Sequence, residues 1–290
     1  MKKLFFILTA TFLPFSSNAW EPCGTDYKGN TANCEYQIVN GTLTIRGTGD
    51  NGNIGWWQEA RLYAPWYHKG VTNVVIEDSI KNLGYQGFSG ITSRNSIVVP
   101  NSITSLHSDA FKGLYADEVI VPDSVTSIGS YAFCYATIKS INIPESVTSI
   151  GASAFMDAPS LKNVIIPDSV TSIGQGAFYG CKNLQSLTIS DEVNLQAMFT
   201  YLGKVSYPSN LKIYCTGDTA KCDANLEAAG YPELKSIGAT TKKINGVSYV
   251  YDKNGKLVTT SGHRTEKRIY TVEEANAVSG KINTVKLRYK

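Results

Sequence analysis

The amino-acid sequence predicts a repeat solenoid, in which short units stack so that one parallel β-sheet lies in front of turns and little helix. Three observations predict it. A peptide that begins with proline recurs with nearly the same letters at Pro122, Pro144 and Pro167, and weaker copies begin at Glu77 and Pro100. A phenylalanine follows each copy, and an alternating apolar segment follows the phenylalanine of the stronger copies. Recurrence at a short fixed period is typical of stacked repeat architectures.

Each alternating segment is predicted to form a short strand. Ile138, Ile141 and Ile143 are spaced so that one face of the strand points inward. Proline then ends the strand, because it has no N–H to donate to a neighbouring strand. A glycine follows the Thr-Ser-Ile segment of each strong copy, and we expect it to allow a tight turn. These glycines are Gly129, Gly151 and Gly174.

The phenylalanines are predicted to form a structural ladder behind the sheet. They are Phe88, Phe111, Phe133, Phe155 and Phe178, at spacings of 23, 22, 22 and 23 residues. A single unit of this length cannot bury its own apolar face, so successive units must stack. We therefore interpret the column as core packing without chemistry.

The unit P-x-S-V-T-S-I-G-x-x-A-F, with the strand that follows it, resembles the BspA-type leucine-rich repeat of bacterial surface proteins. The segments Gly41–Gly49, Ala64–Tyr67 and Val74–Asp78 resemble the lead-in of those proteins. The resemblance covers roughly residues 23–190, and the pattern departs from it after Ile189. It implies a secreted or surface-displayed protein that binds host matrix proteins or other cells. The resemblance brings neither catalytic residues nor a cofactor.

The first 19 residues are predicted to be a cleaved signal peptide. Lys2 and Lys3 precede an apolar run from Leu4 to Leu13, and small residues end at Ala19. The run is shorter than the ~20 residues that a membrane helix needs, and no later segment is long and apolar enough to span a bilayer. We therefore expect a protein that is secreted or held at the cell surface.

The remaining chain is predicted to divide into three parts. Residues 20–70 form an N-terminal cap or lead-in, 71–235 the solenoid with its C-terminal cap, and 236–290 a small ββ-α-β module. The module is predicted from the hairpin turns Asn245-Gly246 and Asn254-Gly255, a capping box at Thr271–Glu274 and a final strand, Asn283–Arg288. A role in attachment, export or binding and a plain closing role both remain open for it.

Charge is divided unevenly along the chain, although the net charge is only +3. Residues 20–241 carry 14 basic and 20 acidic side chains, whereas residues 242–290 carry 11 basic and 4 acidic ones. The basic tail could contact anionic polymers, but a solvated surface is the more common meaning of such a run. Nothing in the sequence predicts a nucleic-acid partner.

The six cysteines are predicted to form two local disulfides, which an exported protein can keep. Cys23 is paired with Cys34, and Cys215 with Cys222 across a short turn. Cys134 and Cys181 lie two repeats apart, which corresponds to roughly 10 Å between stacked strands. A disulfide needs Cα atoms within about 7 Å, so we expect two free buried thiols. Paired CxxC ligands are absent, which argues against a zinc site.

No catalytic, cofactor-binding or metal-binding residue is predicted, and an enzyme is the least favoured of three functions. Asp109 lies two positions after His107 on a turn that we interpret as solvated, while His68 and His263 have no evident partner. Acidic residues that follow each strand stop could bind a cation, but we interpret them as turn-formers. They are Asp123, Glu145, Asp168 and Asp191.

The outward face of the predicted sheet is the candidate binding surface for a protein or another surface macromolecule, such as a component of the host matrix. Its outward positions include more apolar residues than solubility requires, and apolar patches rimmed by polar residues often mark partner sites. The alternatives are β-branched residues that only favour the sheet, or an envelope scaffold without a host ligand. The predicted contact residues are Glu118, Ile120, Asn142, Asn163 and Ile165.

Overall fold

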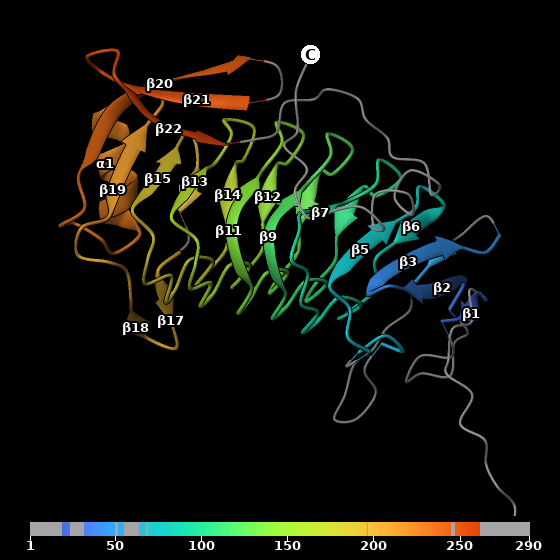
Figure 1. Ribbon diagram of the computed structural model, residues 1–290. Coiled ribbons are helices and arrows are strands. Elements are labelled where there is room, and N and C mark those ends of the chain that lie inside the picture. The colour runs from blue at the N-terminus through green and yellow to red at the C-terminus, as the bar shows by residue number, and fades with distance from the viewer. Residues whose placement is uncertain are drawn as a thin grey trace, which may run out of the picture.

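A computed structural model describes residues 19–23, 32–49, 52–54, 64–67, 69–195, 197–244 and 247–261. The described chain forms a solenoid of stacked turns, with a small sheet at its N-terminal end and one helix at its C-terminal end (Figure 1). Residues 1–18 of the predicted signal peptide, and the helix and last strand predicted after residue 262, lie outside the described residues.

A wall of parallel strands runs along the solenoid, which confirms the predicted fold class. Its strands fall into hydrogen-bonded groups, one of which joins β7, β9 and β11 and another β13, β15 and β19. Within the first group Val119 pairs with both Ile97 and Ile141. The wall consists of β5 (Asn73–Ile76), β7 (Ile97–Val98), β9 (Tyr115–Ile120), β11 (Thr137–Asn142), β13 (Asn163–Ile165), β15 (Ser186–Ile189) and β19 (Lys212–Cys215).

The N-terminal lead-in joins the wall through its own sheet. β1 (Glu21–Pro22), β2 (Cys34–Val39) and β3 (Thr42–Gly47) pair antiparallel, and β3 then pairs parallel with β5. β4 (Gly52–Asn53) and β6 (Ile80–Asn82) form a separate parallel pair. Because β3 and β5 are in register from Thr42 and Asn73 onward, the lead-in covers the first turn of the solenoid.

A second parallel ladder lies on another side of the turns, where the sequence predicted only turns. Its five strands have two residues each, and serine pairs with serine between Ser105, Ser127, Ser149 and Ser172. The earlier serine of each repeat also bonds the preceding turn: Ser124 and Ser146 each donate to a backbone carbonyl 2.6 Å away. The strands are β8 (Ser105–Leu106), β10 (Ser127–Ile128), β12 (Ser149–Ile150), β14 (Ser172–Ile173) and β16 (Asn194–Leu195).

The repeated glycines are required by the close approach of successive turns. A Cβ atom on Gly151 would lie 2.5 Å from the backbone nitrogen of Ser130, and one on Gly174 would lie 2.5 Å from that of Ala152. A left-handed φ occurs elsewhere, two residues before and two after each ladder phenylalanine. Those positions hold Gln86, Gly90, Asp109, Gly113, Tyr131, Tyr135, Ser153, Asp157, Gly176 and Gly180. The tight turn that we expected at the repeated glycines is therefore made by the left-handed residues on either side of each ladder phenylalanine.

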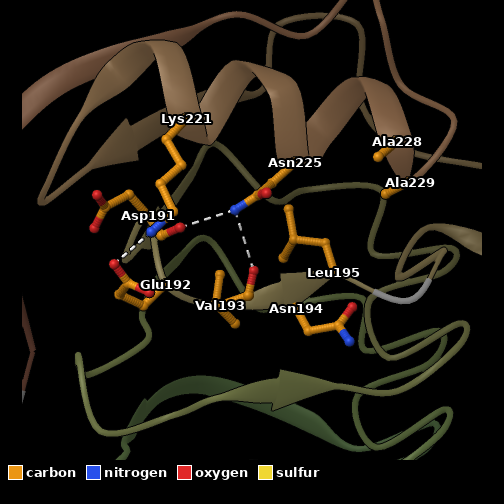
Figure 2. A pocket seen from close by; sticks show the side chains of 9 residues that line it. All are labelled: Asp191, Glu192, Val193, Asn194, Leu195, Lys221, Asn225, Ala228 and Ala229. Carbon is orange, nitrogen blue, oxygen red and sulfur yellow. Dashed lines mark hydrogen bonds and ion pairs between the residues drawn. The ribbon is translucent and has the colours of Figure 1, made fainter.

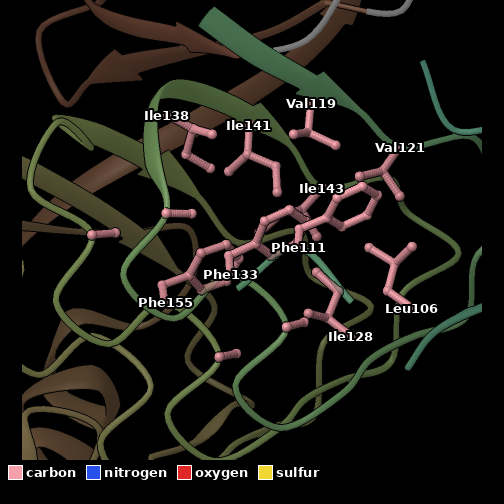
Figure 3. Packing of buried hydrophobic residues seen from close by; sticks show 14 of the residues in the cluster. Leu106, Phe111, Val119, Val121, Ile128, Phe133, Ile138, Ile141, Ile143 and Phe155 are labelled. Carbon is pink, nitrogen blue, oxygen red and sulfur yellow. The ribbon is translucent and has the colours of Figure 1, made fainter. Parts of the chain in front are cut away.

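The five phenylalanines stack in one fully buried column, of which Figure 3 shows Phe111, Phe133 and Phe155. Each neighbouring pair of rings has centroids 5.3 Å apart, and the planes of Phe133 and Phe155 differ by only 1°. The backbone follows the same step, because the amide of Phe133 donates to the carbonyl of Ala154 at 2.7 Å. Inward wall residues such as Val119 and Ile141 lie on one side of the column, and Leu106 and Ile128 lie on another (Figure 3).

The C-terminal end of the solenoid is closed by a hairpin and a helix. The hairpin consists of β17 (Thr200–Tyr201) and β18 (Lys204–Val205), and the helix α1 spans Thr219–Ala228. We predicted a simple turn between Cys215 and Cys222, whereas Cys222 lies inside α1. The Asp218 side chain caps this helix by accepting the amide of Ala220 at 2.8 Å. Buried Tyr231 ends the core and accepts the amide of Phe199 at 2.8 Å.

Three final strands continue the wall and then fold over it. β20 (Ser236–Ile244) pairs parallel with β19, where Tyr214 is opposite Ile237, and then pairs antiparallel with β21 (Val247–Asp252). β22 (Leu257–Ser261) completes this meander and lies near β13 and β11. The strands on either side of both predicted hairpin turns are therefore paired antiparallel, and β20 is continuous with the solenoid sheet.

Replacement of Phe133 by alanine should lower the free energy of unfolding by about 3–5 kcal/mol, because it leaves a cavity in the middle of the ring column. Denaturant unfolding of the full chain measures this effect. The exposed Thr126 offers a control, since its replacement by alanine should change the midpoint little. An unchanged midpoint for the Phe133 variant would contradict the ladder.

Candidate binding surface

Three of the predicted contact residues lie together on a part of the wall that stays partly exposed among the described residues. Glu118 and Ile120 on β9 are opposite Ser140 and Asn142 on β11, and all four side chains are partly exposed. On the other side of β9, Val98 on β7 pairs with Ile120 and is 55% exposed. We call the surface formed by Val98, Glu118, Ile120, Ser140 and Asn142 the open wall.

The prediction that Ile165 faces solvent is wrong. Ile165 is only 6% exposed, and it packs with Tyr214 and Val250 in a small apolar cluster. Val250 belongs to β21, so the meander covers the outward face of β13 and β19 (Figure 1). Asn163 lies at the border of this covered region and accepts a hydrogen bond from the Ser186 hydroxyl at 2.7 Å. The five predicted residues therefore do not form one open surface.

Both predicted disulfides are present. The Cα atoms of Cys23 and Cys34 are 5.5 Å apart, and those of Cys215 and Cys222 are 6.4 Å apart. Cys134 and Cys181 are buried and free, as predicted. Burial raises the pKa of each of these thiols to about 12. The Cys181 thiol donates to the carbonyl of Phe155 at 3.0 Å.

The column of acidic residues has structural partners where the solenoid ends. Asp168 accepts the hydroxyl of Thr216 at 2.6 Å, and Asp191 accepts the backbone amide of Asp218 at 3.1 Å. Burial raises the pKa of Glu145, Lys243 on β20 opposes this shift, and the charges of Asp168 and Asp123 add to it. In the described part of the chain, no group of three or more His, Cys, Asp or Glu residues could hold a metal ion.

The histidines offer no assembled site among the described residues. His107 is exposed on its turn, but Asp109, two residues later, is buried, so the prediction of a solvated turn is wrong for Asp109. The Asp109 carboxylate forms an ion pair with Lys112 at 2.9 Å. His68 and His263 lie outside the described residues. In the same part of the chain, no helix is long and apolar enough to cross a membrane.

A pocket lies where α1 packs against the last turn of the second ladder (Figure 2). The Asn225 amide donates to the carbonyls of Asp191 and Val193, at 2.9 and 3.4 Å. Lys221 forms an ion pair with Glu192 across its mouth. These polar groups are occupied by contacts that hold the helix to the turn, and the lining residues include no nucleophile paired with a base.

Comparison with known protein families agrees with this architecture. The sequence profile of the BspA type leucine rich repeat region matches residues 64–185 and 126–240, in six copies. The chain is similar to a leucine rich cell surface protein from Faecalibacterium prausnitzii, at 19% identity over 59% of each chain with a TM-score of 0.40. It therefore spans less than two thirds of that protein.

Two other solved structures are also similar. One is a leucine rich repeat protein of T. pallidum, at 20% identity over 69% of this chain and 94% of that one, with a TM-score of 0.37. The other comes from Eubacterium ventriosum, at 16% identity over 65% and 77% of the two chains, with a TM-score of 0.30. No curated protein sequence matches the chain.

The thiols of Cys134 and Cys181 should not react with an alkylating reagent in the folded protein at about pH 8, because burial keeps them protonated and inaccessible. Unfolding in denaturant without a reductant should expose both, while the four disulfide-bonded cysteines stay protected. Mass spectrometry of the alkylated protein counts the modified residues. Rapid labelling of the folded chain, or a disulfide-linked Cys134–Cys181 peptide, would contradict the packing described above.

Proposed function

The chain belongs to the BspA type leucine rich repeat family, and on that premise we propose that it is a secreted or cell-surface protein whose open wall binds a macromolecular partner, such as a host matrix protein. The signal peptide that the sequence predicts for the first 19 residues supports export. Neighbouring strands of the wall are held by backbone hydrogen bonds, so the surface is preorganised. A partner that binds it loses less conformational entropy than one that must first order a loop.

The observation that carries this proposal is the exposure of apolar residues on the open wall. Val98 is 55% exposed beside Ile120, and polar side chains from β9 and β11 border them. Burial of such surface by a partner contributes about 25 cal/mol per Å² before the costs of association. Exposed apolar surface with a polar rim is typical of interaction sites.

The meander provides an internal example of the same recognition. On the neighbouring part of the wall, Val250 of β21 packs on Ile165 and Tyr214 and excludes water from them. At β13 and β19 the outward face of the wall thus packs against an apolar surface that the chain itself supplies. β7, β9 and β11 offer the same type of parallel surface to a partner from outside.

A double variant, Val98→Lys with Ile120→Lys, should abolish binding of the mature protein to extracellular-matrix or bacterial-surface fractions, because it places two charges in the proposed contact. The lysine stems can lie along the wall, so the unfolding midpoint should change little. Thr126→Lys is the matched control, since Thr126 is exposed on the second ladder. Surface plasmon resonance compares the three proteins.

Equal binding by the folded double variant and the unmodified chain would place the contact outside the open wall. Deletion of residues 262–290, which keeps the β20–β22 meander in the chain, would then test the last part of the basic tail. Failure of the unmodified chain to bind any of these fractions would contradict the proposed function itself.

A further inference from the structure

The last described strand carries the chain to the border of the open wall. β20 begins beside β19 and extends to the hairpin tip at Ile244, and β21 returns from that tip (Figure 1). β22 then runs outward again, because Leu257 lies opposite Tyr251 whereas Ser261 lies opposite Ser248, close to the tip. Along this path β22 contacts β13 and β11. The chain therefore passes Ser261 on the side of β11, which is the first strand of the open wall that it meets.

The outer edge of β22 has no partner strand among the described residues. There β22 pairs with β21 alone, and it is the last strand of its sheet. An edge strand presents N–H and C=O groups that can pair with another segment. Val258 of β22 already packs against the cluster of Ile165, Tyr214 and Val250. A strand added at this edge would continue the layer that the meander places over the wall.

The chain beyond β22 is long enough to return to this edge. Residues 262–282 separate β22 from the strand predicted at Asn283–Arg288, and both segments lie outside the described residues. A connection between parallel neighbouring strands needs about a dozen or more residues and is usually helical. The capping box at Thr271–Glu274 predicts a helix within this connection. The predicted strand can thus reach the free edge of β22 in parallel orientation.

The predicted strand has an apolar face that matches the open wall. Val285 and Leu287 alternate with polar and basic residues, so a strand places both on one side. The open wall offers Val98, which is 55% exposed, beside the partly exposed Ile120. Contact between the two apolar pairs would remove all four side chains from water, as Val250 does for Ile165 on the neighbouring part of the wall.

Charge favours the same match. Residues 262–290 carry seven basic and three acidic side chains, whereas the one charged member of the open wall is Glu118. Lys139 on β11 is neutralised by a carboxylate of β9 at 2.6 Å. Burial raises the pKa of Glu145, which follows β11, and the Lys243 ammonium of β20 opposes that shift. A basic strand beside β22 would bring further positive charge to the same acidic edge.

We propose that Asn283–Arg288 pairs with the free edge of β22 and packs Val285 and Leu287 on the open wall. The chain itself then supplies the first occupant of that surface. The proposal rests on the proposed function in one respect, since an outside partner would have to displace this segment. The apparent affinity for the partner falls in proportion to the fraction of chains in which the wall is free.

Hydrogen exchange of the full mature chain, followed by mass spectrometry, tests the proposal without an outside partner. The amides of residues 283–288 should exchange about tenfold or more slowly than in a synthetic peptide of residues 281–290, because pairing with β22 protects them. The variant Val285→Gln with Leu287→Gln should exchange as fast as the peptide of its own sequence. Thr284→Gln, on the opposite face of the segment, is the control and should keep the protection.

A second variant shows whether the protected segment lies on the open wall. Val98→Lys with Ile120→Lys should raise the exchange of residues 283–288 toward the peptide rate, while the protein stays folded. Peptide-like exchange in the unmodified chain, or full protection in this variant, would overturn the proposal. Protection that appears only at concentrations where light scattering detects a dimer would also overturn it and assign the occupant to a second copy.

The exchange result stands whether or not the mature chain binds matrix or bacterial-surface fractions, so the failure of the proposed function is distinguishable from failure here. For a fraction that binds, the variant Val285→Gln with Leu287→Gln should bind more tightly than the unmodified chain, because its wall is free. Equal or weaker binding by that variant would show that the segment does not compete for the open wall, and would overturn the proposal.

Discussion

Successive turns of this solenoid stack at one constant spacing. Every set of equivalent residues along the solenoid, such as the phenylalanines, glycines and serines of the repeat, has to pack at that spacing. The ladder rings are 5.3 Å apart, close to the spacing of about 4.8 Å at which neighbouring strands exchange hydrogen bonds. The same step brings backbones so near that Gly151 and Gly174 leave no room for a Cβ atom. Serine hydroxyls then satisfy carbonyls of the preceding turn, as Ser146 does for Val125. The repeated residues of the sequence are therefore those that allow successive turns to stack at this one spacing.

The sequence predicts those features in which a residue type and a period coincide. Alternating isoleucines, the phenylalanine column and locally spaced cysteines each define a structural role without knowledge of the rest of the chain. The second ladder was not predicted, because the Thr-Ser-Ile segment is too short to show an alternation of apolar and polar residues. Its two-residue strands form only by pairing with the same segment of neighbouring turns. The left-handed positions were also missed, since Tyr131 and Tyr135 are residues that ordinarily argue against such a backbone.

The candidate surface was predicted only in part, for a different physical reason. The outward direction of Ile120 and Asn142 follows from strand alternation. The cover over Ile165 depends on how the meander docks, and docking is decided by contacts between segments far apart in the sequence, such as Val250 with Ile165 and Tyr214. The same repeats thus offer an open wall at β7, β9 and β11 and a self-occupied wall beyond them.

The free energies of unfolding of Gly151→Ala and Gly238→Ala test most directly whether the close stacking of turns governs the fold. A Cβ at Gly151 would lie 2.5 Å from backbone, whereas one at Gly238 would lie 3.6 Å from its nearest neighbour, Thr219, and neither glycine has a left-handed φ. Close stacking predicts that Gly151→Ala loses about 1–3 kcal/mol, as overpacked sites do, while Gly238→Ala changes little. Equal stabilities for the two variants would contradict it.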